Sequence, residues 1–196
     1  MNFPERYKAD IVSAVESIDL EKVSEVIELF KAARAHGHNI FVCGNTPSAA
    51  TAAQVLCEQV ARSSFEQATR FRMFAINGHE PNSAADQTGA SKERLFVEHL
   101  KNFAESGDIV VGISASGNAV PILRAFEYAT RAGCTTVAFT GLDGGALSAK
   151  AQVVIHVGST HLGTVEDTHV IICHLIGSYF LEFDRLESVM TYSSVG

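Results

Sequence analysis

Two short segments rich in hydroxyl groups and glycine carry the first chemistry that the sequence suggests. Residues 114–118 (Ser-Ala-Ser-Gly-Asn) and residues 44–48 (Gly-Asn-Thr-Pro-Ser) each follow an apolar run. Hydroxyl groups, a glycine that lets the backbone approach closely and the free N–H groups of a helix start together form a phosphate site. Each segment also fits an ordinary capped turn, with Ser48 as a helix N-cap. Neither matches Gly-x-x-x-x-Gly-Lys-Ser/Thr or Gly-x-Gly-x-x-Gly, which argues against nucleoside triphosphates and dinucleotides.

A carboxylate in an apolar stretch is the second candidate. Glu58 lies about three turns into a helix predicted from about Ser48 to Ala61, and its neighbours in sequence are mainly apolar. Such a group is either partly buried with a raised pKa or part of a narrow polar face. The sequence leaves both interpretations open.

Two histidines lie on a nearly uniformly apolar helix predicted from about Thr164 to Phe183. His169 and His174 are five residues apart, so at 3.6 residues per turn they point in different directions and are not expected to bind one metal ion together. A single histidine on an apolar helix is most often a core residue. Glu166 precedes His174 by two turns and lies on roughly the same side of the helix.

The elements that must position these residues alternate along the chain. Short apolar runs predict strands at 39–43, 72–76, 108–114, 135–140 and 153–157. Helical spacing predicts helices at about 7–17, 20–36, 48–61, 92–106, 120–132 and 164–183, while the polar residues 77–91 are predicted to form a loop. Alternating strands and helices predict an α/β fold, a parallel sheet with helices on both faces, in which ligands bind beyond the carboxyl ends of the strands. The segments rich in glycine and hydroxyl groups fall at those ends.

The length of 196 residues predicts one domain. Within it, residues 1–37 form N-terminal helices, 38–184 the core and 185–196 a tail. Hydrophobic residues make up 46% of the chain and charged residues 19%, which is enough apolar side chain for a sizeable core. The apolar last helix is expected to be covered by neighbouring elements or subunits.

Charge, hydropathy and cysteine pattern argue against some classes of partner and predict a cellular compartment. A net charge of −7 argues against nucleic-acid binding and against a polybasic membrane anchor. No apolar run reaches about 18 residues and no signal peptide is recognised, so the protein is expected in the cytoplasm, away from membranes. The cysteines Cys43, Cys57, Cys134 and Cys173 form no Cys-x-x-Cys pair and are predicted to be buried free thiols.

Taken together, these motifs resemble the sugar isomerase (SIS) domain, and within it the phosphoheptose isomerases most closely. The resemblance covers residues 40–183 and is carried by residues 114–118 with their strand and by residues 138–145 (Ala-Phe-Thr-Gly-Leu-Asp-Gly-Gly). It implies a three-layer α/β/α sandwich in a flavodoxin-like arrangement. It also implies a homotetramer with active sites at subunit interfaces, and a phosphorylated sugar as ligand.

The resemblance also implies roles for single residues. Glu58 matches the family's catalytic glutamate and His174 its catalytic histidine, an acid–base pair acting through an enediol(ate). His169 matches a second histidine with no assigned role and is kept as a core residue. The residues expected to hold the substrate and its phosphate are Asn45, Ser48, Arg62, Ser114, Ser116, Gly117, Asn118 and Glu166.

The chain departs from the family pattern at its first loop and at a metal position. Thr46 and Pro47 replace two glycines. Members that hold zinc use His, Glu, Gln and His at positions that read Gln54, Glu58, Glu166 and His174 here. Losing an imidazole weakens zinc binding, so no cofactor and no tightly bound metal are expected. The segment 77–91 also lacks the usual pattern, which leaves the identity of the sugar open.

Two functions follow from the retained and the altered residues. Retention of Glu58 and His174 favours an aldose–ketose isomerase of sugar phosphates, most like sedoheptulose 7-phosphate isomerase. The altered loop and the missing histidine favour a non-catalytic SIS protein, either a sensor of sugar phosphates or a scaffold that binds a replication initiator.

Overall fold

A five-stranded parallel sheet forms the middle layer of the molecule, in the strand order β2-β1-β3-β4-β5. The computed structural model describes residues 2–65, 67–77 and 89–183. The strands are β1 (Asn39–Gly44), β2 (Arg72–Asn77), β3 (Ile109–Ser114), β4 (Thr135–Thr140) and β5 (Val153–His156). The predicted parallel sheet is therefore confirmed, and each predicted strand is present within one residue at either end.

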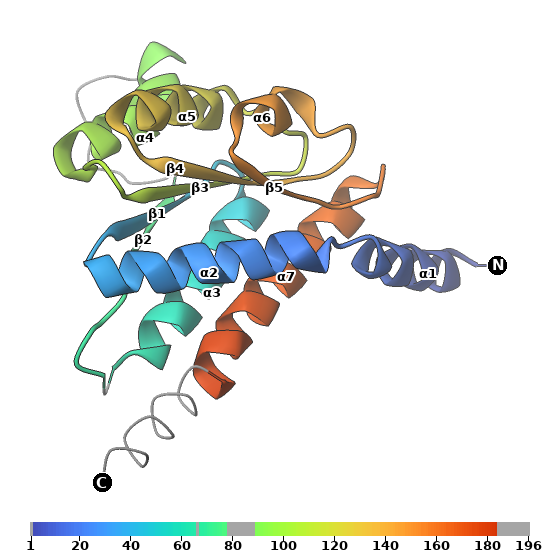
Figure 1. Ribbon diagram of the computed structural model, residues 1–196. Coiled ribbons are helices and arrows are strands. Elements are labelled where there is room, and N and C mark those ends of the chain that lie inside the picture. Colours follow the sequence, from blue (N-terminus) through green and yellow to red (C-terminus); the bar gives the residue numbers. More distant parts are fainter. Residues whose placement is uncertain (1, 66, 78–88, 184–196) are drawn as a thin grey trace, which may run out of the picture.

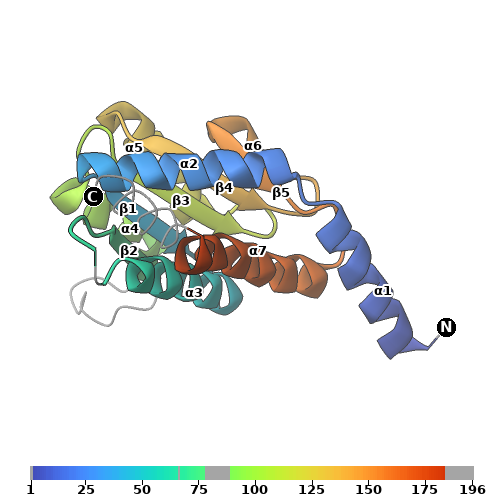
Figure 2. The same ribbon diagram turned by 60° about the horizontal axis from the view of Figure 1, so that its bottom comes forward.

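Helices cover both faces of this sheet (Figure 1). One face carries α4 (Gly89–Phe103), α5 (Val120–Ala132) and α6 (Gly145–Lys150), and the other carries α2 (Leu20–His36), α3 (Pro47–Ser63) and α7 (Leu162–Glu182). The predicted three-layer α/β/α arrangement is confirmed. Helix α1 (Phe3–Glu16) extends away from the three layers and touches the beginning of α7 (Figure 2).

Strand β1 shows why the strands read as continuous apolar runs. Ile40 and Val42 belong to the core under α2, α3 and α7, whereas Phe41 and Cys43 belong to the core under α4 and α5. All four residues are buried, because a parallel strand with helices on both faces exposes neither of them. Strand β1 is consequently shielded from solvent on both faces up to its carboxyl end.

The strand order reverses at β1, which pairs with β2 on one side and with β3 on the other. The chain leaves β1 toward one side and leaves β3 toward the opposite side, so the two following loops separate at the carboxyl edge. Such a switch point opens a crevice that α/β proteins use for ligands. Residues 44–48 and 114–118 both begin at this point.

Several helix boundaries agree with sequence prediction. Helix α2 begins after Asp19, whose side chain caps it, and ends at Gly37 with φ 72°. Helix α5 spans the predicted residues and ends at Gly133 with φ 81°. Two glycines with left-handed backbone geometry thus terminate helices where the sequence indicated.

Other boundaries differ for local reasons. Helix α1 begins at Phe3 rather than near residue 7, because Asn2 and Glu5 form a capping box and a proline fits the first turn. Helix α4 begins and ends three residues earlier than predicted, and α6 was not predicted at all. Of the predicted loop 77–91, residues 78–88 lie outside the described residues, as does the predicted tail 185–196.

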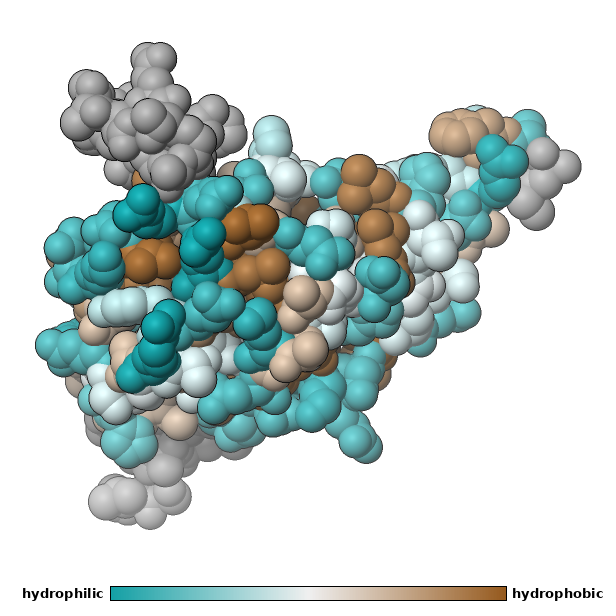
Figure 3. Space-filling model, turned by 90° about the horizontal axis from the view of Figure 1, so that it is seen from above, coloured by the Kyte–Doolittle hydropathy of each residue, from teal (hydrophilic) through white to brown (hydrophobic). Residues whose placement is uncertain are grey.

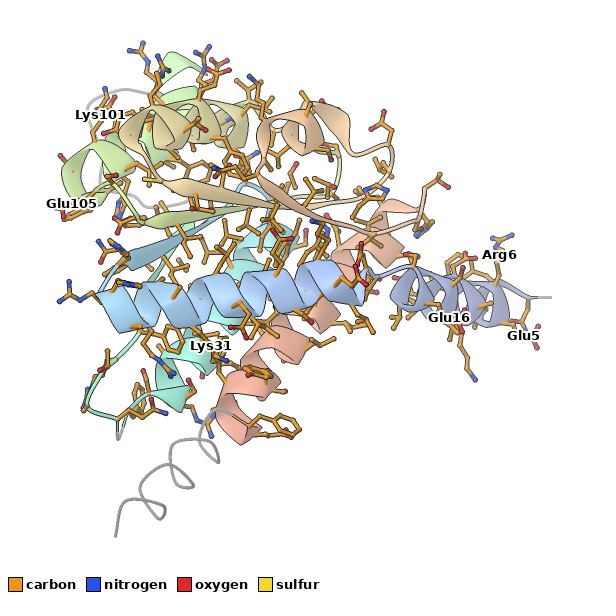
Figure 4. The ribbon with its side chains drawn as sticks, viewed as in Figure 1. Glu5, Arg6, Glu16, Lys31, Lys101 and Glu105 are labelled. Atoms are coloured by element: carbon orange, nitrogen blue, oxygen red, sulfur yellow. The ribbon has the colours of Figure 1, made fainter. Side chains whose placement is uncertain are left out.

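The outer surfaces carry most of the charge. The face formed by α4, α5 and α6 is largely hydrophilic, with small separate hydrophobic areas (Figure 3). Glu5, Arg6 and Glu16 lie along α1, away from the sheet (Figure 4). Among the described residues, no helix combines the length and the hydropathy needed to cross a membrane.

The four cysteines are buried and free, as predicted. Burial raises the pKa of the Cys57 thiol to about 12 and that of the Cys134 thiol to about 11. These thiols therefore stay protonated at neutral pH and act as small core side chains.

Candidate active site

The loop after β1 enters α3 through a Thr-Pro pair. Thr46 is the N-cap, and its Oγ1 accepts a hydrogen bond from the Ala49 N–H at 3.3 Å. The expectation that Ser48 caps this helix is wrong, because the Thr46 hydroxyl takes that role. Pro47 occupies the first helical position, where no N–H is needed. Ser48 lies inside the first turn with its Oγ 3.0 Å from Thr46 Oγ1, so two hydroxyl groups stand together beside half-buried Asn45.

The loop after β3 is shaped by a close approach of two backbones. Gly117 has φ 65°, and a Cβ added to it would lie 1.9 Å from the Gly144 carbonyl oxygen. The Leu147 N–H donates to the Gly117 carbonyl at 2.8 Å, which fixes the start of α6 to this loop. Only glycine combines this backbone geometry with this contact. Ser114 is buried at the end of β3 and Ser116 is half-buried on the loop, so both hydroxyl groups are held by a rigid turn.

Asn118 completes this turn with its side chain. Its Oδ1 accepts from the Ala146 N–H at 3.0 Å and its Nδ2 donates to the Ser116 carbonyl at 3.1 Å. Its backbone N–H donates to Ser116 Oγ at 3.2 Å, which leaves the Ser116 hydroxyl proton available for another acceptor. Ala119 follows as the N-cap of α5 without any side-chain cap. Pro121 has no N–H and the Ile122 N–H donates to the Ala119 carbonyl at 3.0 Å, so the Val120 N–H is the donor at the start of α5 that remains for an anion.

A small cavity lies where these two loops meet α7. Its volume is about 10 Å³, which is room for one water molecule or one hydroxyl group. It is lined by Thr46, Ser48, Ala49, Ala115, Glu166 and His169. The structure thus brings Ser48 and Glu166 together with Ala115 of the 114–118 loop. It adds His169, which sequence reasoning had left in the core.

His169 is buried as expected, yet it forms part of the cavity wall. Its Nε2 lies 3.3 Å from the Thr140 carbonyl oxygen. Burial lowers its pKa from the usual 6.5 to about 4, the bond to Thr140 opposes this shift, and the charge of His156 adds to it. One signal could have identified the residue: Glu166 and His169 are three positions apart and share one face of α7.

The proposed acid–base pair lies elsewhere on the same chain. Glu58 is exposed on α3 and His174 is exposed on α7. A Cβ on Gly177 would meet the Gln59 side chain, so this part of α3 packs directly on this part of α7. Ten residues separate Ser48 from Glu58, which is about 15 Å along the helix axis at about 1.5 Å per residue. One chain alone therefore does not bring Glu58 and His174 to the cavity.

Exposure also decides between the two interpretations of Glu58. Gln54, Glu58 and Arg62 follow one another at four-residue spacing, and all three are exposed. They form a narrow polar face on α3, while the intervening residues Leu56, Cys57 and Val60 are buried against the core. The alternative of a partly buried carboxylate is excluded for the single chain.

The four residues at the family's zinc positions do not form a metal site within this chain. Gln54, Glu58 and His174 are exposed on helix faces, whereas Glu166 lines the cavity about 12 Å along α7 from His174. Only one of the four is an imidazole, and zinc sites in proteins favour several nitrogen or sulfur ligands. Across residues 2–65, 67–77 and 89–183, no group of three or more His, Cys, Asp or Glu side chains is arranged to hold a metal ion.

Comparison with known proteins gives one consistent result. The SIS domain family model matches residues 5–141. The chain is 33% identical over 171 residues to a phosphoheptose isomerase of Citrifermentans bemidjiense, covering 86% of this chain and 83% of the relative. It is 29% identical over 160 residues to a probable phosphoheptose isomerase of Thermoplasma acidophilum, covering 82% and 87%. The structure of a phosphoheptose isomerase from Neisseria gonorrhoeae shares the fold, with a TM-score of 0.77 at 21% identity over 91% of this chain and 98% of that one.

Proposed function

The chain belongs to the SIS domain family, and we propose that it is a sugar-phosphate isomerase that converts sedoheptulose 7-phosphate into an aldose phosphate. The observation that carries the proposal is the polar cavity at the switch point of the sheet, between the hydroxyl-bearing loops after β1 and β3. Relatives about 30% identical to the chain over most of its length are phosphoheptose isomerases, which supports this substrate class.

The phosphate group is held by the two loops. Ser48, Ser114 and Ser116 supply hydroxyl groups, and the uncapped start of α5 supplies the backbone N–H of Val120. An anion at this position also gains from the helix dipole. Thr46 takes the Ala49 N–H and Pro47 has no N–H, so at the start of α3 the phosphate relies on the Ser48 hydroxyl group.

The reaction moves one proton between neighbouring carbons. A base removes a proton from C1 of the ketose, the C2 carbonyl becomes part of an enediol(ate), and the proton returns at C2 while the O1 proton leaves to form the aldehyde. Glu58 is the base at carbon, and His174 carries the proton between the oxygens. Asn45 and Arg62 contact the sugar, as the family resemblance implies.

The distance of about 15 Å along α3 favours a site shared between subunits. In that arrangement the phosphate loops come from one subunit, and Glu58 and His174 come from its neighbours. A homotetramer suits the exposed apolar side chains of α1 and α7, including Phe3, Val12 and Leu175. Light scattering at micromolar concentration is expected to give four times the chain mass, and a monomer would refute the shared site.

Turnover of sedoheptulose 7-phosphate tests the proposal directly. Glu58→Gln and His174→Gln are expected to lower the rate by about 10²–10⁴-fold, while sugar-phosphate affinity persists. Glu98→Gln is the matched control, since Glu98 is an exposed glutamate of α4 that pairs only with Lys101 among the described residues. Its rate should equal that of the wild type.

Mixed oligomers test the shared site. Chains carrying Glu58→Gln and chains carrying His174→Gln should regain activity when combined, because some interfaces then hold both native side chains. If the wild type binds pentose, hexose and heptose phosphates but isomerises none of them, the non-catalytic alternative holds. If Glu58→Gln keeps the full rate, the assignment of the base is wrong.

A further inference from the structure

His169 is a polar side chain at the inner wall of the cavity, and the proposed reaction does not use it. Only 2% of its surface is exposed, and it lines the same cavity as the hydroxyl-bearing residues Thr46 and Ser48 and as Glu166. Burying a polar imidazole ring costs desolvation free energy unless its nitrogen atoms form hydrogen bonds. Its hydrogen bonds therefore indicate what it does.

The contact with β4 fixes which ring nitrogen carries the proton. Nε2 lies 3.3 Å from the carbonyl oxygen of Thr140, the last residue of the strand. A carbonyl oxygen only accepts, so Nε2 donates and the neutral ring is the Nε2–H tautomer. The other nitrogen, Nδ1, is then an acceptor with a free lone pair. Because Thr140 belongs to the rigid sheet, the ring is held in one orientation.

Nδ1 has no hydrogen-bond partner among the described residues. Two buried side-chain polar atoms of that part of the chain lack both a partner and solvent, Gln59 Oε1 and Gln67 Nε2, and Nδ1 of His169 is not one of them. Nδ1 therefore retains access to solvent, which for a ring this deeply buried means the cavity that it lines. The lowered pKa keeps the ring neutral at physiological pH, so Nδ1 stays an acceptor.

We infer that His169 is a substrate-binding residue whose Nδ1 accepts a hydrogen bond from a hydroxyl group of the sugar phosphate. The inference rests on the proposed function, because the phosphate on the neighbouring loops brings that hydroxyl to the cavity. The volume of about 10 Å³ fits one hydroxyl group. Glu166 adds a second acceptor at the same wall. Two acceptors beside an anion site favour a phosphorylated polyol and disfavour a second anionic group.

Two substitutions separate this role from a structural one. His169→Gln reaches the position of Nε2 and keeps a donor for Thr140, but it removes the acceptor at Nδ1. His169→Asn keeps an acceptor near the position of Nδ1 and loses the bond to Thr140. The pair is measured by calorimetric titration with sedoheptulose 7-phosphate and with inorganic phosphate, and by thermal unfolding.

His169→Gln is expected to weaken sedoheptulose 7-phosphate binding about 10-fold, in line with one lost hydrogen bond, with inorganic phosphate affinity and melting temperature unchanged. His169→Asn is expected to keep the sugar-phosphate affinity within about 3-fold and to melt earlier. Nitrogen-15 spectra of the wild type should show the Nε2–H tautomer, with the Nδ1 signal moving when sedoheptulose 7-phosphate is added but not with inorganic phosphate.

Each outcome decides something. Equal sugar-phosphate affinity for the wild type and His169→Gln, or an Nδ1–H tautomer in the wild type, overturns the role of His169 and leaves the isomerase proposal intact. A wild type that binds inorganic phosphate but no sedoheptulose 7-phosphate overturns both. Equal losses for the two ligands in His169→Gln would show that the ring only shapes the loop, which also overturns the inference.

Discussion

The packing of Gly117 on the α6 start gives the sharpest prediction about the phosphate loops. Replacing Gly117 by alanine places a Cβ 1.9 Å from the Gly144 carbonyl oxygen at a φ of 65°. The left-handed geometry alone costs a residue with a Cβ about 1 kcal/mol. The contact also forces the two backbones apart, which weakens the bonds from Leu147 N–H and Ala146 N–H to the 117–118 segment. Each of these is worth about 1 kcal/mol, so the total is about 3 kcal/mol.

Gly37→Ala is the matched control for this experiment. Gly37 has φ 72°, and nothing lies within 4 Å of an added Cβ. Its substitution therefore carries the backbone strain without the contact, about 1 kcal/mol. For a chain of this length the melting temperature should fall by about 2–4 °C in Gly37→Ala and by about 6–12 °C in Gly117→Ala.

Ligand binding gives the second readout of the same pair. Inorganic phosphate should raise the melting temperature of the wild type and of Gly37→Ala by linkage. It should raise that of Gly117→Ala much less, since the 114–118 loop no longer keeps its shape. Equal destabilisation and equal phosphate response in the two variants would refute the account of this loop.

Three further predictions concern other parts of the molecule. Asp108 is buried and accepts three hydrogen bonds from N–H groups at the amino edge of the sheet. Asp108→Ala should therefore lower the free energy of unfolding by about 3 kcal/mol or more in urea titrations, without changing phosphate affinity. An unchanged free energy of unfolding would contradict this prediction. The pKa of His169 is about 4 in the folded state and 6.5 in the unfolded state, so the unfolded state binds a proton first as pH falls. The free energy of unfolding should therefore decline by about 3 kcal/mol between pH 6.5 and pH 4. His169→Gln should remove this part of the decline, and identical pH profiles for the two proteins would contradict the prediction. Metal analysis of protein purified without added metal should find no stoichiometric zinc, whereas Gln54→His should raise zinc occupancy in the assembled protein by restoring an imidazole. Stoichiometric zinc in the wild type would show that the remaining residues bind the ion without that imidazole.

The elements governed by local rules could be predicted from the sequence. Strands buried on both faces are unbroken apolar runs, and α2 carries its own start signal at Asp19 and its own stop signal at Gly37. Helix α6 could not be predicted, since its six residues begin with a glycine and its start depends on bonds to Gly117 and Asn118 from a distant part of the chain. Such contacts have no signature in local periodicity.

The site likewise combines features set by local sequence patterns with features set by contacts between distant segments. The position of the two loops that we propose to bind phosphate could be predicted, because a strand followed by hydroxyl groups, glycine and a helix start is a local pattern. The place of His169 could not, because it depends on how deep α7 lies against the end of β4. Equally, sequence order does not reveal that Glu58 lies three turns below the loop that begins its own helix, a consequence of the direction in which α3 runs from the sheet edge.

The few contacts that attach α1 to the rest of the chain determine how readily this helix unfolds locally. This helix buries a single residue, Ala14, and is tied to the body by the Tyr7 hydroxyl bond to Asp167 at 2.5 Å and by Ser17, which accepts from the Gly158 N–H at 2.9 Å. A helix of 14 residues is marginal in water by itself, so in an isolated chain its amide protons exchange through local unfolding that leaves the sheet intact. Protection of the α1 amides beyond that level has to come from neighbouring subunits. Hydrogen exchange along this one helix is thus a direct gauge of assembly, read at single residues and independent of any ligand.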